Sequence, residues 1–211
     1  MGKLKCDFRV VGPVQTNCYF LSDEETKECI IVDPGAEAKS LLSYIEKNGL
    51  KVTAILLTHG HFDHILAVDS LKNAFQVPVY AAEAEKEILL DPDMNLSLQV
   101  GTSVTVEADK WLKDGEKMEL LGQEVRCILT PGHTCGGMCY YFPKAGILFS
   151  GDTLFQESVG RSDFPTGSTS TLIRSIRERL FVLPKAVRVY PGHGSVTSIE
   201  NEAMYNPFAA I

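Results

Sequence analysis

The sequence predicts an α/β (α+β) fold in which two β-sheets pack face to face and helices cover their outer sides. Each half of the 211-residue chain carries several short β-prone runs followed by helical patterns, and this order of elements implies such layers. The chain is long enough to bury one sizeable core, and its 45% hydrophobic and 22% charged residues are typical of globular proteins. No low-complexity linker separates the halves, so we expect one domain over residues 1–211.

Apolar spacing places the elements of the first half. Short apolar or β-branched runs predict strands over residues 8–11, 19–21, 29–32, 52–58 and 77–80. Apolar residues at helical spacing predict helices over residues 36–48, from about 64 to 75, and over 84–90. Residues 93–101 alternate apolar and polar side chains. This alternation fits packing at a sheet edge, or else an apolar wall beside a pocket or a subunit contact.

The second half of the chain again shows β-prone runs and helical patterns. Further strands are predicted over residues 104–106, 117–120, 124–129, 138–142, 147–150 and 187–190. Residues 169–183 carry an apolar stripe that predicts a long helix, and a final short helix is expected near residues 199–204.

Three of the five histidines lie in one loop. Residues 58–64 read THGHFDH and directly follow an apolar run that predicts a buried strand. His59, His61, Asp63 and His64 therefore fall together at a strand end. Imidazole nitrogen and carboxylate oxygen are ligands that Zn²⁺, Fe²⁺ and Mn²⁺ accept, so this loop is a candidate metal site.

The remaining two histidines also follow predicted strands. His133 and His193 each come after a β-rich run and a Pro-Gly turn signal, and Asp152 ends the apolar run 147–151. Four strand ends thus each deliver a potential ligand, and no histidine is left for another catalytic arrangement. Sites built from several strand ends on one rim of a scaffold are a common way to place catalytic groups.

The H-x-H-x-D-H stretch, followed by a later His, Asp and His, resembles the metallo-β-lactamase-fold hydrolases. Within them the sequence is most similar to the glyoxalase II-like branch, the hydroxyacylglutathione hydrolases. Supporting segments are residues 15–19, 32–35, 151–155 and 160–164, and the resemblance runs from residue 12 to about 208. It implies the αββα sandwich of that fold. Typical glyoxalase II adds a C-terminal helical domain, and since this chain ends at residue 211 we expect the short single-domain type without it.

The resemblance implies two divalent metal ions, with Zn²⁺ preferred and iron or manganese as alternatives. It assigns the first ion to His59, His61 and His133. It assigns the second ion to Asp63, His64 and His193, with Asp152 bridging both. Asp63 and Asp152 are thus the expected catalytic carboxylates, Asp63 also orienting the nucleophile. Asp33 is expected beneath the metal loop as support for a ligating histidine, the alternative being a solvated turn residue.

The implied activity is hydrolysis of a thioester, S-lactoylglutathione or a similar acyl thioester. Paired cations lower the pKa of a shared water, and the resulting hydroxide would attack the carbonyl carbon. Arg161 resembles the position where the family presents a cationic glutathione contact, and its planar fork suits a substrate carboxylate. The alternative is an exposed structural arginine.

Two other activities stay open. A persulfide dioxygenase would use a single iron held by His59, His133 and Asp152, and residues 160–164 resemble that branch too. A metallo-hydrolase acting on another ester or lactone is the second. A periplasmic β-lactam hydrolase is disfavoured, because no signal peptide is evident and Asp152 stands where such enzymes often place cysteine.

Charge and hydropathy limit the partners. The net charge of −7 disfavours nucleic acid, which binds clustered lysine and arginine. No apolar stretch suits a secretory signal, and nowhere do about eighteen apolar residues run together, so we expect no membrane span and a cytoplasmic location. We expect a small-molecule substrate, and a monomer and a homodimer both stay open.

The six cysteines do not predict a disulfide framework. Cys6, Cys18, Cys29 and Cys127 lie in or beside strand-like runs, where a thiol behaves as a small buried hydrophobe. Cys135 and Cys139 are expected to be reduced thiols packed near the site, with a redox or ligand role for Cys135 as the alternative.

Overall fold

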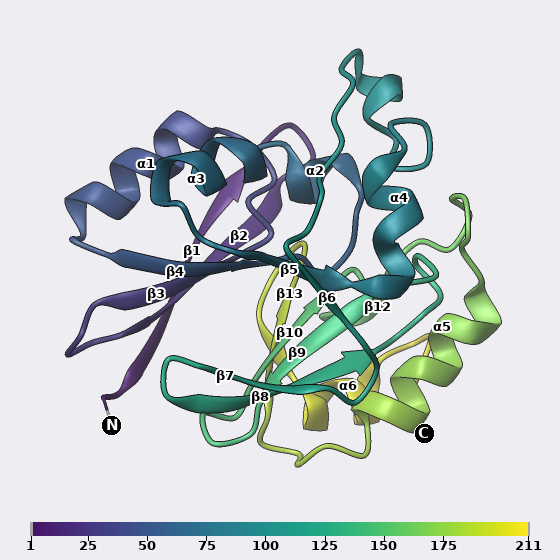
Figure 1. Cartoon of the computed structure of the whole chain (residues 1–211). Coiled ribbons are helices and arrows are strands. Elements are labelled where there is room, and N and C mark those ends of the chain that lie inside the picture. The colour runs from purple at the N-terminus through teal and green to yellow at the C-terminus, as the bar shows by residue number, and fades with distance from the viewer. Residues whose placement is uncertain (1, 211) are drawn as a thin grey trace.

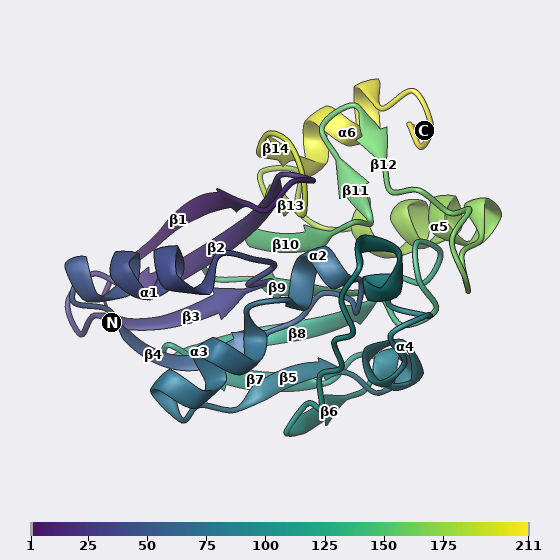
Figure 2. The same cartoon turned by 90° about the horizontal axis from the view of Figure 1, so that it is seen from above.

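The computed structural model describes residues 2–210 and shows two six-stranded sheets packed face to face, with helices on both outer faces (Figure 1). This confirms the predicted αββα sandwich. The view from above shows α1 and α3 lying across the first sheet, while α5 and α6 lie on the far side beside the second sheet (Figure 2). No helix within residues 2–210 is long and apolar enough to cross a membrane.

The first sheet has the strand order β1-β2-β3-β4-β5-β6. Its strands are β1 Leu4–Val11, β2 Thr16–Asp23, β3 Glu28–Val32, β4 Lys51–Leu56, β5 Val79–Ala82 and β6 Lys110–Leu112. The first three pair antiparallel, whereas β3, β4, β5 and β6 run parallel. The carboxyl ends of the parallel strands therefore meet at one edge, and their following loops lie side by side.

The second sheet has the order β14-β13-β10-β9-β8-β7. Its strands are β7 Lys117–Leu120, β8 Gln123–Leu129, β9 Met138–Phe142, β10 Ile147–Gly151, β13 Arg188–Pro191 and β14 Thr197–Ser198. Only β10 and β13 pair in parallel, so this sheet also brings two carboxyl ends together. A small hairpin, β11 Leu154–Phe155 and β12 Ser158–Val159, follows β10.

The helices are short. They are α1 Ala38–Lys47, α2 Phe62–Ile65, α3 Val68–Phe75, α4 Lys86–Leu90, α5 Thr169–Ser175 and α6 Ile199–Tyr205. Two 3₁₀ turns, η1 Glu83–Glu85 and η2 Ser97–Val100, and a π-helical segment, η3 Ile176–Leu180, complete them. Ser168 and Ser198 cap α5 and α6, because each hydroxyl accepts a backbone N–H of the first turn.

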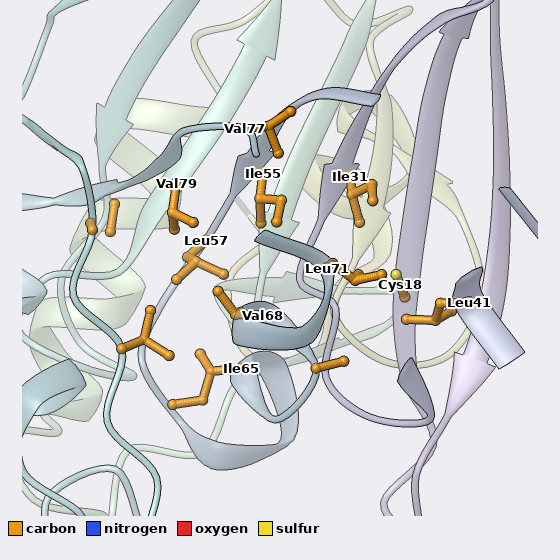
Figure 3. Close-up of a cluster of buried hydrophobic side chains, with 14 of the residues drawn as sticks. Cys18, Ile31, Leu41, Ile55, Leu57, Ile65, Val68, Leu71, Val77 and Val79 are labelled. Carbon is orange, nitrogen blue, oxygen red and sulfur yellow. The ribbon is translucent and has the colours of Figure 1, made fainter. Parts of the chain in front are cut away.

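Apolar side chains fill both the space between the sheets and the space beneath the helices. In the inner layer, Tyr140 and Phe149 of the second sheet pack with Leu56 of the first. On the outer face of the first sheet, Leu71 of α3 packs with Ile55 of β4 in the cluster drawn in Figure 3. Both faces of each sheet are thus packed with apolar side chains. Polar groups are therefore expected in the loops at the carboxyl ends of the strands.

Several expected elements differ from the structure. The strand predicted over residues 104–106 is absent, because Val104 bonds to the side chains of Asn95 and Ser97 and Val106 bonds to the backbone of Leu89. Residues 93–101 form turns and η2, so the sheet-edge interpretation is wrong. The helix predicted over residues 169–183 divides into α5 and η3. Strands β6, β11, β12 and β14 have only two or three residues each, too few for a periodic signal.

Truncation of a core residue should measure how much the outer layer stabilises the scaffold. Leu71 is fully buried, so Leu71→Ala should lower the free energy of unfolding by about 2–5 kcal/mol through lost burial and a residual cavity. Urea denaturation followed by circular dichroism measures it. Leu98→Ala is the control, because Leu98 is 53% exposed and should change stability by no more than about 0.5 kcal/mol. Equal losses in both variants would contradict this packing.

Candidate metal centre

The strand-end loops of both sheets converge on one cluster of ligands. The first sheet supplies the loop after β4, with His59, His61, Asp63 and His64. The second sheet supplies the loops after β8, β10 and β13, with one ligand each. These three are His133, Asp152 and His193. All seven metal-ligand candidates from the sequence are therefore brought together between the sheets.

Three imidazoles form the first cluster. His61 Nδ1 lies 2.9 Å from His133 Nε2, which lies 3.2 Å from His59 Nε2. Tetrahedral zinc with nitrogen ligands at about 2.05 Å places those nitrogens about 3.3 Å apart, so the spacing suits one ion. Burial lowers the pKa of His61 to about 3 and that of His59 well below its usual value. Both rings are thus neutral, the form that binds metal.

A carboxylate and two imidazoles form the second cluster. Asp63 Oδ2 lies 3.3 Å from His64 Nε2 and 3.2 Å from His193 Nε2. Burial acts to raise the pKa of Asp63, but the neighbouring His64 and the hydrogen bond with His193 outweigh it and hold that pKa far below the usual range. The carboxylate is therefore charged at neutral pH.

Asp152 lies between the two clusters. Its Oδ1 is 3.5 Å from His64 Nε2, and its Oδ2 is 3.6 Å from His133 Nε2 and 3.5 Å from His193 Nε2. Asp152 Oδ1 and His64 Nε2 are both buried without a hydrogen-bond partner. Leaving such groups unpaired costs about 1–3 kcal/mol each, and a cation would satisfy both. The residues present therefore fit a divalent metal ion in each cluster.

Asp33 supports the second cluster from below, as predicted. Its Oδ1 accepts the Thr58 N–H at 2.8 Å, and its Oδ2 accepts the Thr58 hydroxyl at 2.6 Å. The same Oδ2 lies 2.9 Å from His64 Nδ1. Because Nδ1 is thereby held by a carboxylate, Nε2 of the ring is directed at Asp63 and Asp152. The backbone of Asp33 is left-handed, with φ of 51°, at the point where the chain leaves β3.

Sequence reasoning missed two further supports at the start of β2. The Thr16 hydroxyl donates to Asp63 Oδ2 at 2.8 Å. The Asn17 side-chain amide donates to the carbonyls of Pro191 at 3.0 Å and Gly194 at 2.9 Å, which flank His193. Both side chains are buried, and fully polar residues at the head of an otherwise apolar strand are the signal that could have identified them.

A cavity of about 410 Å³ opens above the ligands. Its apolar lining consists of Val14, Phe62, Leu96, Phe155, Val159 and Phe164. Leu96 in this lining favours the apolar-wall interpretation for residues 93–101. Ligands from both clusters also line the cavity, and they are His61, Asp63, His133, Asp152 and His193. The cavity therefore connects both clusters with solvent through mostly apolar walls, as ligand pockets commonly do.

Arg161 lies at this cavity with its side chain exposed. Its guanidinium binds Asp163 through two hydrogen bonds, of 3.0 and 2.8 Å, and stacks 4.2 Å above the Phe164 ring. Its carbonyl lies 2.6 Å from His133 Nδ1, which fixes the orientation of that ligand. Arg161, the predicted substrate contact, thus lies beside the site, but its guanidinium is already paired with Asp163.

The cysteines lie outside the ligand clusters of the described residues, and all six are free thiols. Cys139 is buried, and burial raises its pKa to about 11. The Cys135 thiol is exposed and donates to the carbonyl of Ala84 at 3.3 Å. Cys139 is thus a packed, buried thiol, and Cys135 is an exposed thiol that belongs to no ligand cluster of the described residues.

Comparison with known proteins agrees with this geometry. The family model of the metallo-beta-lactamase superfamily matches residues 11–193. A Bacillus subtilis protein named probable metallo-hydrolase YqgX is 40% identical over 200 residues, covering 94% of each chain. A Haemophilus influenzae protein named hydroxyacylglutathione hydrolase GloC is 36% identical over 201 residues, again covering 94% of each chain.

Two solved structures share the fold closely. The crystal structure of BLEG-1, a B3 metallo-beta-lactamase, has a TM-score of 0.92 and 39% identity, covering 97% of this chain and 99% of the other. The structure of TTHA1623 in a di-iron-bound form has a TM-score of 0.85 and 36% identity, covering 96% and 99%. The chain therefore belongs to the metallo-beta-lactamase superfamily.

Proposed function

We propose that this protein is a metal-dependent thioester hydrolase that holds two divalent ions, with Zn²⁺ preferred and iron or manganese as alternatives. The observation that carries the proposal is the pair of complete ligand clusters joined by Asp152 at the floor of one cavity. The di-iron form of TTHA1623 supports two ions. The Haemophilus influenzae relative supports S-lactoylglutathione, or a similar small acyl thioester, as substrate.

His59, His61 and His133 would hold one ion, Asp63, His64 and His193 the other, and Asp152 both. Bound there, the ions would lower the pKa of a water towards about 7 and polarise a carbonyl. Asp63 faces the cavity as a carboxylate, so it can accept a hydrogen bond from the attacking water and orient its lone pair. Thr16 holds that carboxylate in place.

The cavity walls would contribute two things to the reaction. Their apolar side chains would exclude water, and Arg161 would supply one positive charge. Six apolar side chains surround the reacting group, and a less polar environment strengthens electrostatic interactions with the site. Arg161 would exchange Asp163 for a substrate carboxylate, and stacking on Phe164 keeps its guanidinium in place during that exchange. The proposed ligand is a compact, anionic thioester. We further propose that the protein works in the cytoplasm as a monomer or homodimer.

The persulfide dioxygenase alternative needs only His59, His133 and Asp152 with one iron. The second cluster would have no purpose in that reaction, although its three ligands lie within 4.8 Å of one another. Completeness of both clusters therefore favours hydrolysis. A lactam ring is a second acyl group worth testing, because BLEG-1 carries the name of a β-lactamase.

Anaerobic turnover of S-lactoylglutathione tests the proposed function directly. We expect thiol release that stops when a chelator removes the metal and returns when Zn²⁺ is restored. Asp152→Ala should abolish release while leaving a folded protein, because Asp152 lies in a loop outside the three apolar clusters. Glu119→Ala, which changes an exposed carboxylate on β7, is the matched control and should retain full activity.

The same assay separates the alternatives. A metal-loaded protein that releases no thiol, yet consumes oxygen with a persulfide, would overturn the hydrolase proposal in favour of the dioxygenase. Hydrolysis of a β-lactam or lactone without thioester cleavage would keep the metal centre and replace the substrate class.

Substitution of Arg161 tests its role in binding. Arg161→Ala should raise KM several-fold with little change in kcat, because the side chain binds the substrate equally in the ground state and the transition state. Asp163→Asn should lower KM, since it frees the guanidinium fork that Asp163 now occupies. Unchanged steady-state kinetics in both variants would return Arg161 to a purely structural role.

The two clusters should also lose metal at different pH. Burial acts to lower the pKa of His64, but Asp63, Asp33 and Asp152 outweigh it and raise that pKa well above the usual value. His64 must therefore lose a proton to bind metal, whereas the pKa of His61 is about 3. As the pH falls from 7.5 to about 5, the second cluster should release its ion first. Metal content per chain after gel filtration at each pH measures this, and release from the first cluster before the second would contradict it.

A further inference from the structure

A buried carboxylate outside the ligand set, Glu85, lies between the two loops that form the first cluster. Glu85 is the last residue of η1, the turn that directly follows β5, and it is only 1% exposed. On the same turn the Glu83 side chain is 59% exposed and near only the Lys113 ammonium, at 3.9 Å. The burial of Glu85 is therefore particular to that side chain.

Both oxygens of Glu85 accept hydrogen bonds from residues beside metal ligands. Oε1 accepts the N–H of Gly60 at 2.9 Å, and Gly60 is the residue between His59 and His61. Oε2 accepts the hydroxyl of Thr134 at 2.9 Å, and Thr134 directly follows His133. The N–H of Gly136 also donates to this carboxylate. One side chain thus joins two loops that come from different sheets.

The loops approach Glu85 as closely as their backbones allow. A Cβ added at Gly136 would lie 2.3 Å from the Glu85 backbone nitrogen, and one at Gly60 would lie 3.0 Å from Ile88 of α4. A side chain at Gly136 would displace the backbone of η1, and one at Gly60 would crowd the side chains of Ile88 and Leu89 on α4. The distance between the loops is therefore set by this contact and not by flexible side chains.

The charge of Glu85 has no partner in the scaffold. Within residues 2–210 it forms no ion pair, and burial raises its pKa to about 7 despite the three donors that lower it. Three donors need acceptor oxygens, so the arrangement suits the ionised carboxylate. Burial of a carboxylate without a cationic partner is unfavourable, yet an apolar side chain here would leave three buried donors without an acceptor. A cation held by the neighbouring loops would offset that charge.

We propose that Glu85 is a positioning residue that fixes the spacing of His59 and His61 relative to His133 and so sets the metal affinity of the first cluster. The proposal rests on the two-ion centre proposed above. Asp33 and Thr16 bond directly to ligands of the second cluster, whereas Glu85 bonds to Gly60 and Thr134, which adjoin ligands of the first.

Metal affinity of each cluster, measured by competition with a chromophoric chelator, tests the proposal. Glu85→Gln keeps the shape but turns an amide N–H₂ towards a donor. Introduced into His193→Ala, which retains the first cluster intact, it should weaken Zn²⁺ binding about 10–100-fold, the usual cost of losing an outer partner of a ligand. Introduced into His61→Ala, which retains the second cluster, it should leave affinity unchanged. Glu83→Gln is the control and should change neither.

Thr134 provides a second test that does not depend on the folding of Glu85→Gln. Thr134→Val removes the donor to Oε2 and should weaken the first cluster in the same direction. Thr134→Ser keeps the hydroxyl and should restore affinity. Unchanged Zn²⁺ affinity in Glu85→Gln and Thr134→Val, or equal weakening of both clusters, would overturn the positioning role.

The outcome for the unmodified chain separates the two proposals. If it binds two Zn²⁺ ions and the variants match it, only the role of Glu85 fails. If it binds none, the metal centre fails, and the role of Glu85 fails with it.

Discussion

The structure depends on one electrostatic constraint, which is that seven potential ligands, four of them buried, gather in a small volume where the strand ends of two apolar sheets meet. Without cations, their charges conflict. The pKa of His59 is pushed far down by burial, while that of His64 is pushed far up by three carboxylates. Asp152 Oδ1 is left without any hydrogen bond. Divalent ions would offset the carboxylate charges around His64 and give Asp152 Oδ1 a partner, so this rim of the fold is suited to holding cations.

The scaffold meets this constraint through strand direction. Parallel pairing of β3, β4 and β5 sends Asp33, the histidine loop and Glu85 to the same edge of the first sheet. Parallel pairing of β10 and β13 does the same for Asp152 and His193 in the second sheet. Because the two sheets face each other, their carboxyl-end loops meet, and a cavity there connects the ligands with solvent.

The sequence was informative where a residue type and its local surroundings decide the outcome. Histidines and aspartates that follow apolar runs identified the clustered ligands, and apolar or β-branched runs identified the longer strands at least in part. The supporting contacts could not be found this way, because their partners are remote in sequence. Glu85 bonds to Thr134, 49 residues away, and Asn17 bonds to Gly194, 177 residues away. The prediction of a strand over residues 104–106 was wrong for a different reason, since the nearby side chains of Asn95 and Ser97 satisfy the backbone of Val104 in place of a neighbouring strand.

The two clusters differ in charge and exposure, and this difference indicates which cluster the substrate carbonyl would face in the proposed centre. Apart from the shared Asp152, the first cluster has only imidazole ligands, whereas the second contributes the charge of Asp63. Fewer anionic ligands leave more positive charge on an ion, so the first cluster would polarise a carbonyl more strongly. The second is also the more open, because the side chain of His193 is 26% exposed and that of Asp63 is 14% exposed. Water would therefore enter beside Asp63, and the carbonyl would face the first cluster, whose geometry Glu85 holds.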